Sequence, residues 1–223
     1  MAIKKFIFQK ITRFLSKKSV YIIKSLFYLN NKRKIPPNFD YVRYSTLELC
    51  YDEINRKKIP GSVAELGVYK GDFAKRLNQL FPERNLYLFD TYSGFSKSDI
   101  ESEVLLGFSS GEQDFSDTST ELIMNIMPYP EKCIIKKGYF PDTTVGIEDI
   151  FCFISIDVDL FNPIYDGLKY FYPRLANGGY IFVHDFNNDE YKGVKQAVLQ
   201  FCSEQNIRFV PIPDICGSIV ITK

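Results

Sequence analysis

Metal- or proton-binding side chains follow two apolar runs that are typical of buried strands. Asp157 and Asp159 end the first run, and His184, the only histidine of the chain, precedes Asp185 at the end of the second. Neighbouring carboxylates raise each other's pKa unless a cation neutralises them, so such a strand end favours a bound ion. Two carboxylates and an imidazole with open positions suit Mg²⁺, Mn²⁺, Fe²⁺ or Zn²⁺. We therefore predict a metal site formed by Asp157, His184 and Asp185; the alternatives are a helix-capping pair of acids and a hydrogen-bonded strand-end histidine.

A glycine turn and another strand-end acid indicate a ligand site nearby. The predicted strand 62–66 leads into Glu65-Leu-Gly-Val-Tyr-Lys-Gly71, and glycine at such a turn lets a ligand approach the backbone closely. Asp90 ends the next predicted strand, where a carboxylate can accept both hydroxyls of a ribose. The turn has neither the three-glycine spacing of dinucleotide sites nor a P-loop lysine–serine pair, which disfavours pyrophosphate and triphosphate ligands. A purely steric glycine turn and a solvated Asp90 remain the alternatives.

Strands and helices alternate along the chain beyond residue 40. The expected helices are 44–55, 72–80, one capped by Thr118 with Glu121 and ending near Met127, one begun by Asn162-Pro163 and stopped at Pro173, and one capped by Asp189. The expected strands are 62–66, 86–90, 133–136, 151–157, 180–184, 207–212 and 218–222. This order predicts a mostly parallel sheet with helices on both faces.

The segment 213–217 decides between two doubly wound folds. Its length is too short for a crossover helix, so the last strand must run antiparallel to its neighbour. By fold-level analogy this favours an α/β class I methyltransferase fold, a Rossmann-like sheet with a C-terminal antiparallel hairpin strand, over a nicotinamide-binding fold.

The polar stretch 93–117 is too long for an ordinary loop, and we expect it to contain a lid or a short helix. Its three phenylalanines, Phe95, Phe108 and Phe115, either contact a sugar face or fix the lid to the body.

Charge divides the chain into two parts. Residues 1–39 contain ten Lys or Arg and no acid, so with a net charge of +1 the remainder carries −9. Apolar residues at helical spacing over 3–15 predict an amphipathic helix, and the apolar run 20–29 is interrupted by Lys24 and Ser25 and is too short to span a bilayer. The arm would pack on the body or a second subunit, or on an anionic membrane surface. Nucleic acid is disfavoured because no basic patch with interleaved aromatic residues continues into the body.

The five cysteines lack any C-x-x-C pair and are expected to be reduced, as in the cytoplasm.

Seven segments, in order, resemble the macrocin O-methyltransferase (TylF-type) family: Val63-Ala-Glu-Leu-Gly-Val-Tyr-Lys-Gly71, Phe89-Asp-Thr-Tyr-Ser-Gly-Phe95, Lys137-Gly-Tyr-Phe-Pro-Asp-Thr143, Ser155-Ile-Asp-Val-Asp-Leu-Phe161, Tyr172-Pro-Arg-Leu-Ala-Asn-Gly-Gly179, His184-Asp-Phe186 and Gly193-Val-Lys-Gln-Ala-Val198. The resemblance covers roughly residues 40 to 222. It implies an enzyme that methylates sugar hydroxyls with S-adenosylmethionine and Mg²⁺, or Mn²⁺ in its place.

The resemblance also implies roles for single residues. Asp157 would be a metal ligand and the catalytic base. The family usually has two adjacent aspartates where this chain has His184-Asp185, so His184 would be a ligand or a second catalytic base. The cofactor would be held by Glu65, Gly67, Tyr69, Asp90, Ser93 and Gly138.

We therefore expect a cytoplasmic O-methyltransferase, in contact with the membrane if the arm binds it, that forms a homodimer and acts on a sugar of a natural product or surface polysaccharide. The alternatives are a methyltransferase for catechols or small phenols, a cofactor-binding module that has lost catalysis through His184, and a nicotinamide-dependent sugar-modifying enzyme.

Overall fold

The computed structural model describes residues 10–15, 17–18 and 40–223. The chain divides into two compact units, Met1–Phe39 and Asp40–Lys223. In the first, residues 10–15 are helical, with Ile11 and Phe14 exposed. The rest of the basic arm lies outside the described residues, so its contact with the body, a second subunit or a membrane stays a prediction. In the described part of the chain, no helix combines the length and apolar character needed to cross a bilayer.

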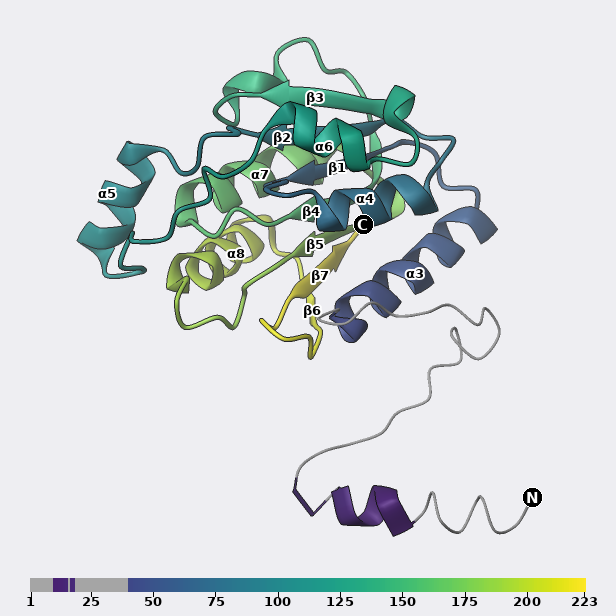
Figure 1. Cartoon of the computed structure of the whole chain (residues 1–223), viewed down its shortest axis with the longest axis horizontal. Coiled ribbons are helices and arrows are strands. Elements are labelled where there is room, and N and C mark those ends of the chain that lie inside the picture. The colour runs from purple at the N-terminus through teal and green to yellow at the C-terminus, as the bar shows by residue number, and fades with distance from the viewer. Residues whose placement is uncertain (1–9, 16, 19–39) are drawn as a thin grey trace. The chain divides into compact units, whose positions relative to one another are not determined.

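The unit Asp40–Lys223 contains a seven-stranded sheet in the order β3-β2-β1-β4-β5-β7-β6 (Figure 1). Strands β1 to β5 pair in parallel, whereas β7 is antiparallel to both β5 and β6. The strands are β1 Ser62–Leu66, β2 Leu86–Asp90, β3 Cys133–Lys137, β4 Phe151–Ile156, β5 Leu175–Val183, β6 Val210–Pro211 and β7 Ile219–Thr222. The predicted class I methyltransferase architecture, including its antiparallel final strand, is confirmed.

Helices cover both faces of this sheet (Figure 1). They are α3 Tyr41–Arg56, α4 Asp72–Leu80, α5 Lys97–Leu106, α6 Thr120–Ile126, α7 Phe161–Arg174 and α8 Lys192–Gln205, with short 3₁₀ turns η1 Pro130–Lys132 and η2 Asp142–Thr144. One apolar core lies under α3, α4 and α6, and includes Leu47, Leu77 and Ile123. The other lies under α7 and α8, and includes Phe171 and Val198. Both faces are therefore buried, as the continuous apolar strands require.

Three predicted helix caps are wrong. The cap of α6 is Ser119, whose hydroxyl accepts from the Leu122 amide, and not Thr118. Helix α7 starts at Phe161, before Asn162, and its first amide is bound by a side chain from α5 (see below). Helix α8 starts at Lys192 after Tyr191, so Asp189 is not its cap. The final hairpin also differs, because the strand expected over 207–212 is confined to Val210–Pro211.

Candidate active site

The strands β1, β4 and β5 are neighbours at the centre of the sheet, and their carboxyl ends are aligned. The Asp157 amide donates to the Leu66 carbonyl at 2.8 Å, and the His184 amide donates to the Ile156 carbonyl at 3.0 Å. Gly67 packs directly on this edge: a Cβ atom there would lie 1.9 Å from the carbonyl oxygen of Asp157. The glycine turn and the strand-end acids therefore form one continuous surface at the switch point of the sheet, where folds of this type bind ligands.

Three acids meet at this edge. Asp157, Asp159 and Asp185 each place one carboxylate oxygen within 4.8 Å of the others, and we call them the three-carboxylate cluster. Asp159 and Asp185 have left-handed backbone conformations, with φ of 61° and 58°, which non-glycine residues rarely adopt. Such strain is found mainly at functional sites, where the surrounding structure maintains it.

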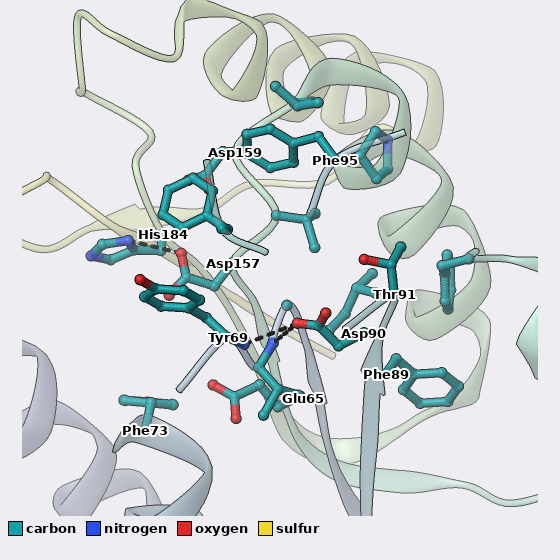
Figure 2. Close-up of a pocket in the computed structure, with 18 of the residues that line it drawn as sticks. Glu65, Tyr69, Phe73, Phe89, Asp90, Thr91, Phe95, Asp157, Asp159 and His184 are labelled. Atoms are coloured by element: carbon teal, nitrogen blue, oxygen red, sulfur yellow. Dashed lines mark hydrogen bonds and ion pairs between the residues drawn. The ribbon is translucent and has the colours of Figure 1, made fainter. Parts of the chain in front are cut away.

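His184 contacts two of these acids, and Figure 2 shows its contact with Asp157. Its Nδ1 is 3.0 Å from Oδ1 of Asp157 and 2.6 Å from Oδ2 of Asp185. The structure therefore brings the predicted trio together and adds Asp159 to it.

Burial and the neighbouring charges shift the pKa values of His184, Asp157 and Asp159. Burial opposes the charged imidazole, but Asp157 and Asp185 raise the pKa of His184 to about 10. Burial also opposes ionisation of Asp157, yet Arg43 and His184 hold the pKa of that carboxyl well below its usual range. The pKa of Asp159 is raised well above its usual range by burial and by the other two acids. The shift at Asp159 therefore reflects repulsion from the two neighbouring carboxylates, which a divalent cation bound to all three would relieve.

Arg43 is a site residue that the sequence did not reveal. From helix α3 its Nη2 donates to Oδ2 of Asp157 at 2.9 Å and to Oγ of Ser155 at 3.3 Å. Its guanidinium lies 4.1 Å from the centre of the Phe73 ring, and the residue is 7% exposed. Both oxygens of Asp157 therefore face cationic partners, one from each side.

A cavity of about 430 Å³ opens beside these residues. Of the six predicted cofactor residues, Glu65, Gly67, Tyr69, Asp90 and Gly138 line it. Ser93 does not: it is exposed, because a tight turn stabilised by the Thr91 hydroxyl directs it away. Thr91 lines the cavity instead.

Asp90 organises the glycine turn. Its Oδ2 accepts from the amides of Val68 at 2.7 Å and Tyr69 at 2.9 Å (Figure 2), and its Oδ1 accepts from the Tyr92 amide at 2.7 Å. One carboxylate therefore joins the turn after β1 to the turn after β2. This fixes the wall of the cavity before any ligand binds.

Glu65 is the penultimate residue of β1, forms part of the cavity wall and is 2% exposed. Its Oε2 is buried without a hydrogen-bond partner. Burial raises the pKa of this carboxyl well above its usual range, although Arg43 opposes the shift. An unpaired buried carboxyl is costly, and a cationic group of a ligand would offset that cost.

Helix α5 lies within the predicted lid, and two buried acids attach it to the body. Asp99 accepts from the Tyr139 hydroxyl at 3.1 Å and from the side-chain amide of Asn162 at 3.2 Å. Glu103 accepts from the Phe161 amide at 2.6 Å, which supplies the missing cap of α7. The lid is therefore docked on the body in this structure.

Two of the three lid phenylalanines line the cavity and the third packs on the body, so contact of the first two with a sugar stays a prediction. Phe95 and Phe115 line the cavity and contact each other edge to face, with ring centres 5.1 Å apart. Phe108 instead stacks on Phe161 with ring centres 5.9 Å apart, which fixes the lid to the body.

We expect Glu103→Gln to loosen the lid. The carboxylate of Glu103, on α5, contacts the first residue of α7 and also lies against Gly193 at the start of α8. A Cβ added at Gly193 would lie 2.6 Å from this carboxylate. Removing a negative charge from two helix N-termini should cost about 1–2 kcal/mol. Amide hydrogen exchange over 97–106 should then accelerate about tenfold. Glu101→Gln, an exposed change on the same helix, is the control, and equal exchange in both variants would contradict this role.

The sheet order, the glycine turn and the strand-end acids define a class I methyltransferase fold. Among solved structures, that of the O-methyltransferase NovP matches with a TM-score of 0.70 at 20% identity, over 88% of this chain and 87% of that one. The calicheamicin methyltransferase CalS11 matches with a TM-score of 0.64 at 18% identity, over 96% and 91% of the two chains.

Sequence comparison identifies the family. The macrocin-O-methyltransferase (TylF) family pattern matches residues 40–221, and the chain belongs to this family. It is 25% identical over 159 residues to the mycinamicin III 3''-O-methyltransferase of Micromonospora griseorubida, covering 65% of this chain and 62% of that protein. It is 22% identical over 157 residues to the demethyldecarbamoylnovobiocin O-methyltransferase of Streptomyces niveus, covering 65% and 60%. The matched region thus spans about three-fifths of each relative's length.

Proposed function

We propose that this protein transfers a methyl group from S-adenosylmethionine to a sugar hydroxyl, assisted by a divalent cation. The observation that carries the proposal is that the three-carboxylate cluster and the unpaired Glu65 carboxyl open into the same cavity. The relatives named above, one of which methylates a 3''-oxygen, support the acceptor class.

The residues present fit the cofactor. S-adenosylmethionine carries a positively charged ammonium and a sulfonium, and the buried Glu65 carboxyl offers the ammonium a partner. Gly67 keeps the turn free of a side chain where the ligand must approach the backbone. Asp90 accepts from three backbone amides and keeps about one of its roughly four acceptor sites for a ribose hydroxyl.

The residues also fit a hard divalent cation. Asp157, Asp159 and Asp185 supply oxygen ligands, which Mg²⁺ and Mn²⁺ prefer. His184 Nδ1 contacts two of these carboxylates, so in this proposal it orients them while Asp157 receives the proton of the acceptor hydroxyl. When bound, the cofactor supplies an activated methyl group and the cation supplies positive charge that makes the hydroxyl more acidic.

Positioning is the other contribution of this chain. Asp99 of the docked α5 and the rings of Phe95 and Phe115 line the cavity, and in this proposal they limit the access of water to it. Holding the reacting atoms in line can supply on the order of 7–11 kcal/mol.

The direct test combines binding with turnover. Calorimetry should show binding of S-adenosylhomocysteine and no binding of NAD. Release of S-adenosylhomocysteine in the presence of glycosylated acceptors should require Mg²⁺ or Mn²⁺ and cease in excess EDTA. Full turnover in EDTA would remove the cation from the proposal, and NAD binding would remove the methyltransferase assignment.

We expect His184→Asp to retain or increase Mg²⁺-dependent activity. The change removes an imidazolium that neutralises Asp157 and Asp185 and adds a carboxylate in its place. The Mg²⁺ concentration for half-maximal activity should fall about tenfold. His184→Asn, which removes the cation without adding a charge, is the control. A folded but inactive His184→Asp variant would show that the imidazole itself is required.

A further inference from the structure

Cys216 places a sulfur ligand beside the candidate active site. It lies in the 213–217 loop, between β6 and β7, and is partly buried. A ring nitrogen of His184, a carboxylate oxygen of Asp185 and Sγ of Cys216 all lie within 4.8 Å of one another. The geometry points to a second metal site made of His184, Asp185 and Cys216, which selects a thiophilic divalent cation such as Zn²⁺ over Mg²⁺.

The 213–217 loop is held firmly enough to present a ligand. Asp214 accepts from the amide and the hydroxyl of Ser218, which closes the loop on itself. The amide of Ile215 donates to Oδ2 of Asp40 at 2.8 Å, which ties the loop to the start of α3. A metal site needs ligands whose positions are fixed in this way before the ion arrives.

The strand-end segment that carries His184 and Asp185 is joined to the same loop. The amide of Asn187 donates to the Cys216 carbonyl at 3.2 Å. Gly217 packs so closely on Asn187 that a Cβ would lie 2.7 Å from its side chain. Asp185 is 4% exposed, and its Oδ1 accepts from the Asn188 side chain at 2.7 Å, so that oxygen is already oriented. The three ligands therefore come from two segments that the backbone itself fastens together.

The donor set decides which ion fits. A tetrahedral ion with metal–ligand distances of about 2.0 to 2.3 Å separates its ligand atoms by roughly 3.3 to 3.8 Å. The three ligand atoms here already lie within 4.8 Å of one another. Thiolate and imidazole ligands suit Zn²⁺, whereas Mg²⁺ takes oxygen ligands. On binding, the Cys216 thiol and the His184 imidazolium each lose a proton to solvent, so that a thiolate and a neutral imidazole bind the metal. Three protein ligands leave a fourth position for water.

Asp185 belongs to both groups of ligands, because it is also part of the three-carboxylate cluster. An ion held by His184 and Cys216 therefore draws Asp185 away from the cation proposed for catalysis. This consequence, which rests on the proposed function, makes Zn²⁺ an inhibitor of Mg²⁺-dependent transfer.

The site is tested with Co²⁺, which replaces Zn²⁺ and gives a thiolate-to-cobalt absorption band in the near ultraviolet. The full chain should show this band, and Zn²⁺ but not millimolar Mg²⁺ should abolish it. Cys216→Ser should lose the band and bind Co²⁺ at least tenfold more weakly. Cys133→Ser, a change at the other partly buried cysteine, should keep both. A wild-type protein without the band, a band that survives in Cys216→Ser, or displacement by Mg²⁺ would overturn the site.

The sharing of Asp185 has its own measurement. Half-inhibition of Mg²⁺-dependent transfer should need at least tenfold more Zn²⁺ in Cys216→Ser than in Cys133→Ser, and equal inhibition would refute the sharing. Failure of the proposed function would give a different result from failure of the metal site. The cobalt band would still depend on Cys216, but the protein would transfer no methyl group.

Discussion

Asp157→Asn should lower the rate of methyl transfer by about a thousandfold, which is within the range expected for loss of a proton acceptor. The change also removes one anionic ligand from the three-carboxylate cluster. Binding of S-adenosylhomocysteine, measured by calorimetry, should change less than threefold, which we take as roughly the limit for a mutation outside the cofactor contacts.

Asparagine is preferable to alanine at this position because of Arg43. The guanidinium is buried against Asp157, and removal of one partner of a buried ion pair typically costs about 3–5 kcal/mol. An asparagine oxygen can still accept from Arg43, so the folded state is better preserved. Ser155→Ala is the matched control, since it removes the other hydrogen bond of the same guanidinium and leaves the carboxylate in place. A methyl-transfer rate of Asp157→Asn within tenfold of the wild-type rate would contradict the proposed role of Asp157 as proton acceptor.

Gly67→Ala should abolish cofactor binding and destabilise the whole domain. The added Cβ would lie 1.9 Å from the Asp157 carbonyl oxygen and 2.6 Å from its carbon, both of them backbone atoms at the centre of the sheet. The backbone at Gly67 is also left-handed, with φ of 88°. We expect a loss of unfolding free energy of about 4 kcal/mol or more, measured by urea denaturation.

The variant Gly146→Ala separates the two causes of destabilisation, which are the contact of the added Cβ and the strain of a left-handed backbone. Gly146 has a similar left-handed φ of 78°, but no atom lies within 4 Å of the Cβ that would be added. Its substitution should therefore cost only the backbone strain, about 1–2 kcal/mol. Equal losses in the two variants would mean that the contact between Gly67 and Asp157 carries no energetic weight.

Local sequence patterns predicted the positions of most elements because those patterns arise from burial. The strands β1 and β2 and the helix α4 have the predicted bounds, since an apolar run or a helical stripe is itself the buried surface. Helix starts were less predictable. Thr118, Asn162 and Asp189 all resemble caps, but the amide at the start of α7 is bound by Glu103, which is 58 residues away in the sequence.

The sequence by itself determined the class of fold and the edge of the sheet that holds the candidate site. Alternating strands and helices with a short 213–217 segment allow few topologies, and parallel strands bring their terminal acids to one edge. Only the tertiary structure decided what those acids contact: Arg43 from α3 on Asp157, Glu103 from α5 at the start of α7, and Cys216 from the last loop beside Asp185. These contacts leave no periodic trace in the sequence, because each depends on how distant elements pack across the sheet rather than on the preferences of neighbouring residues.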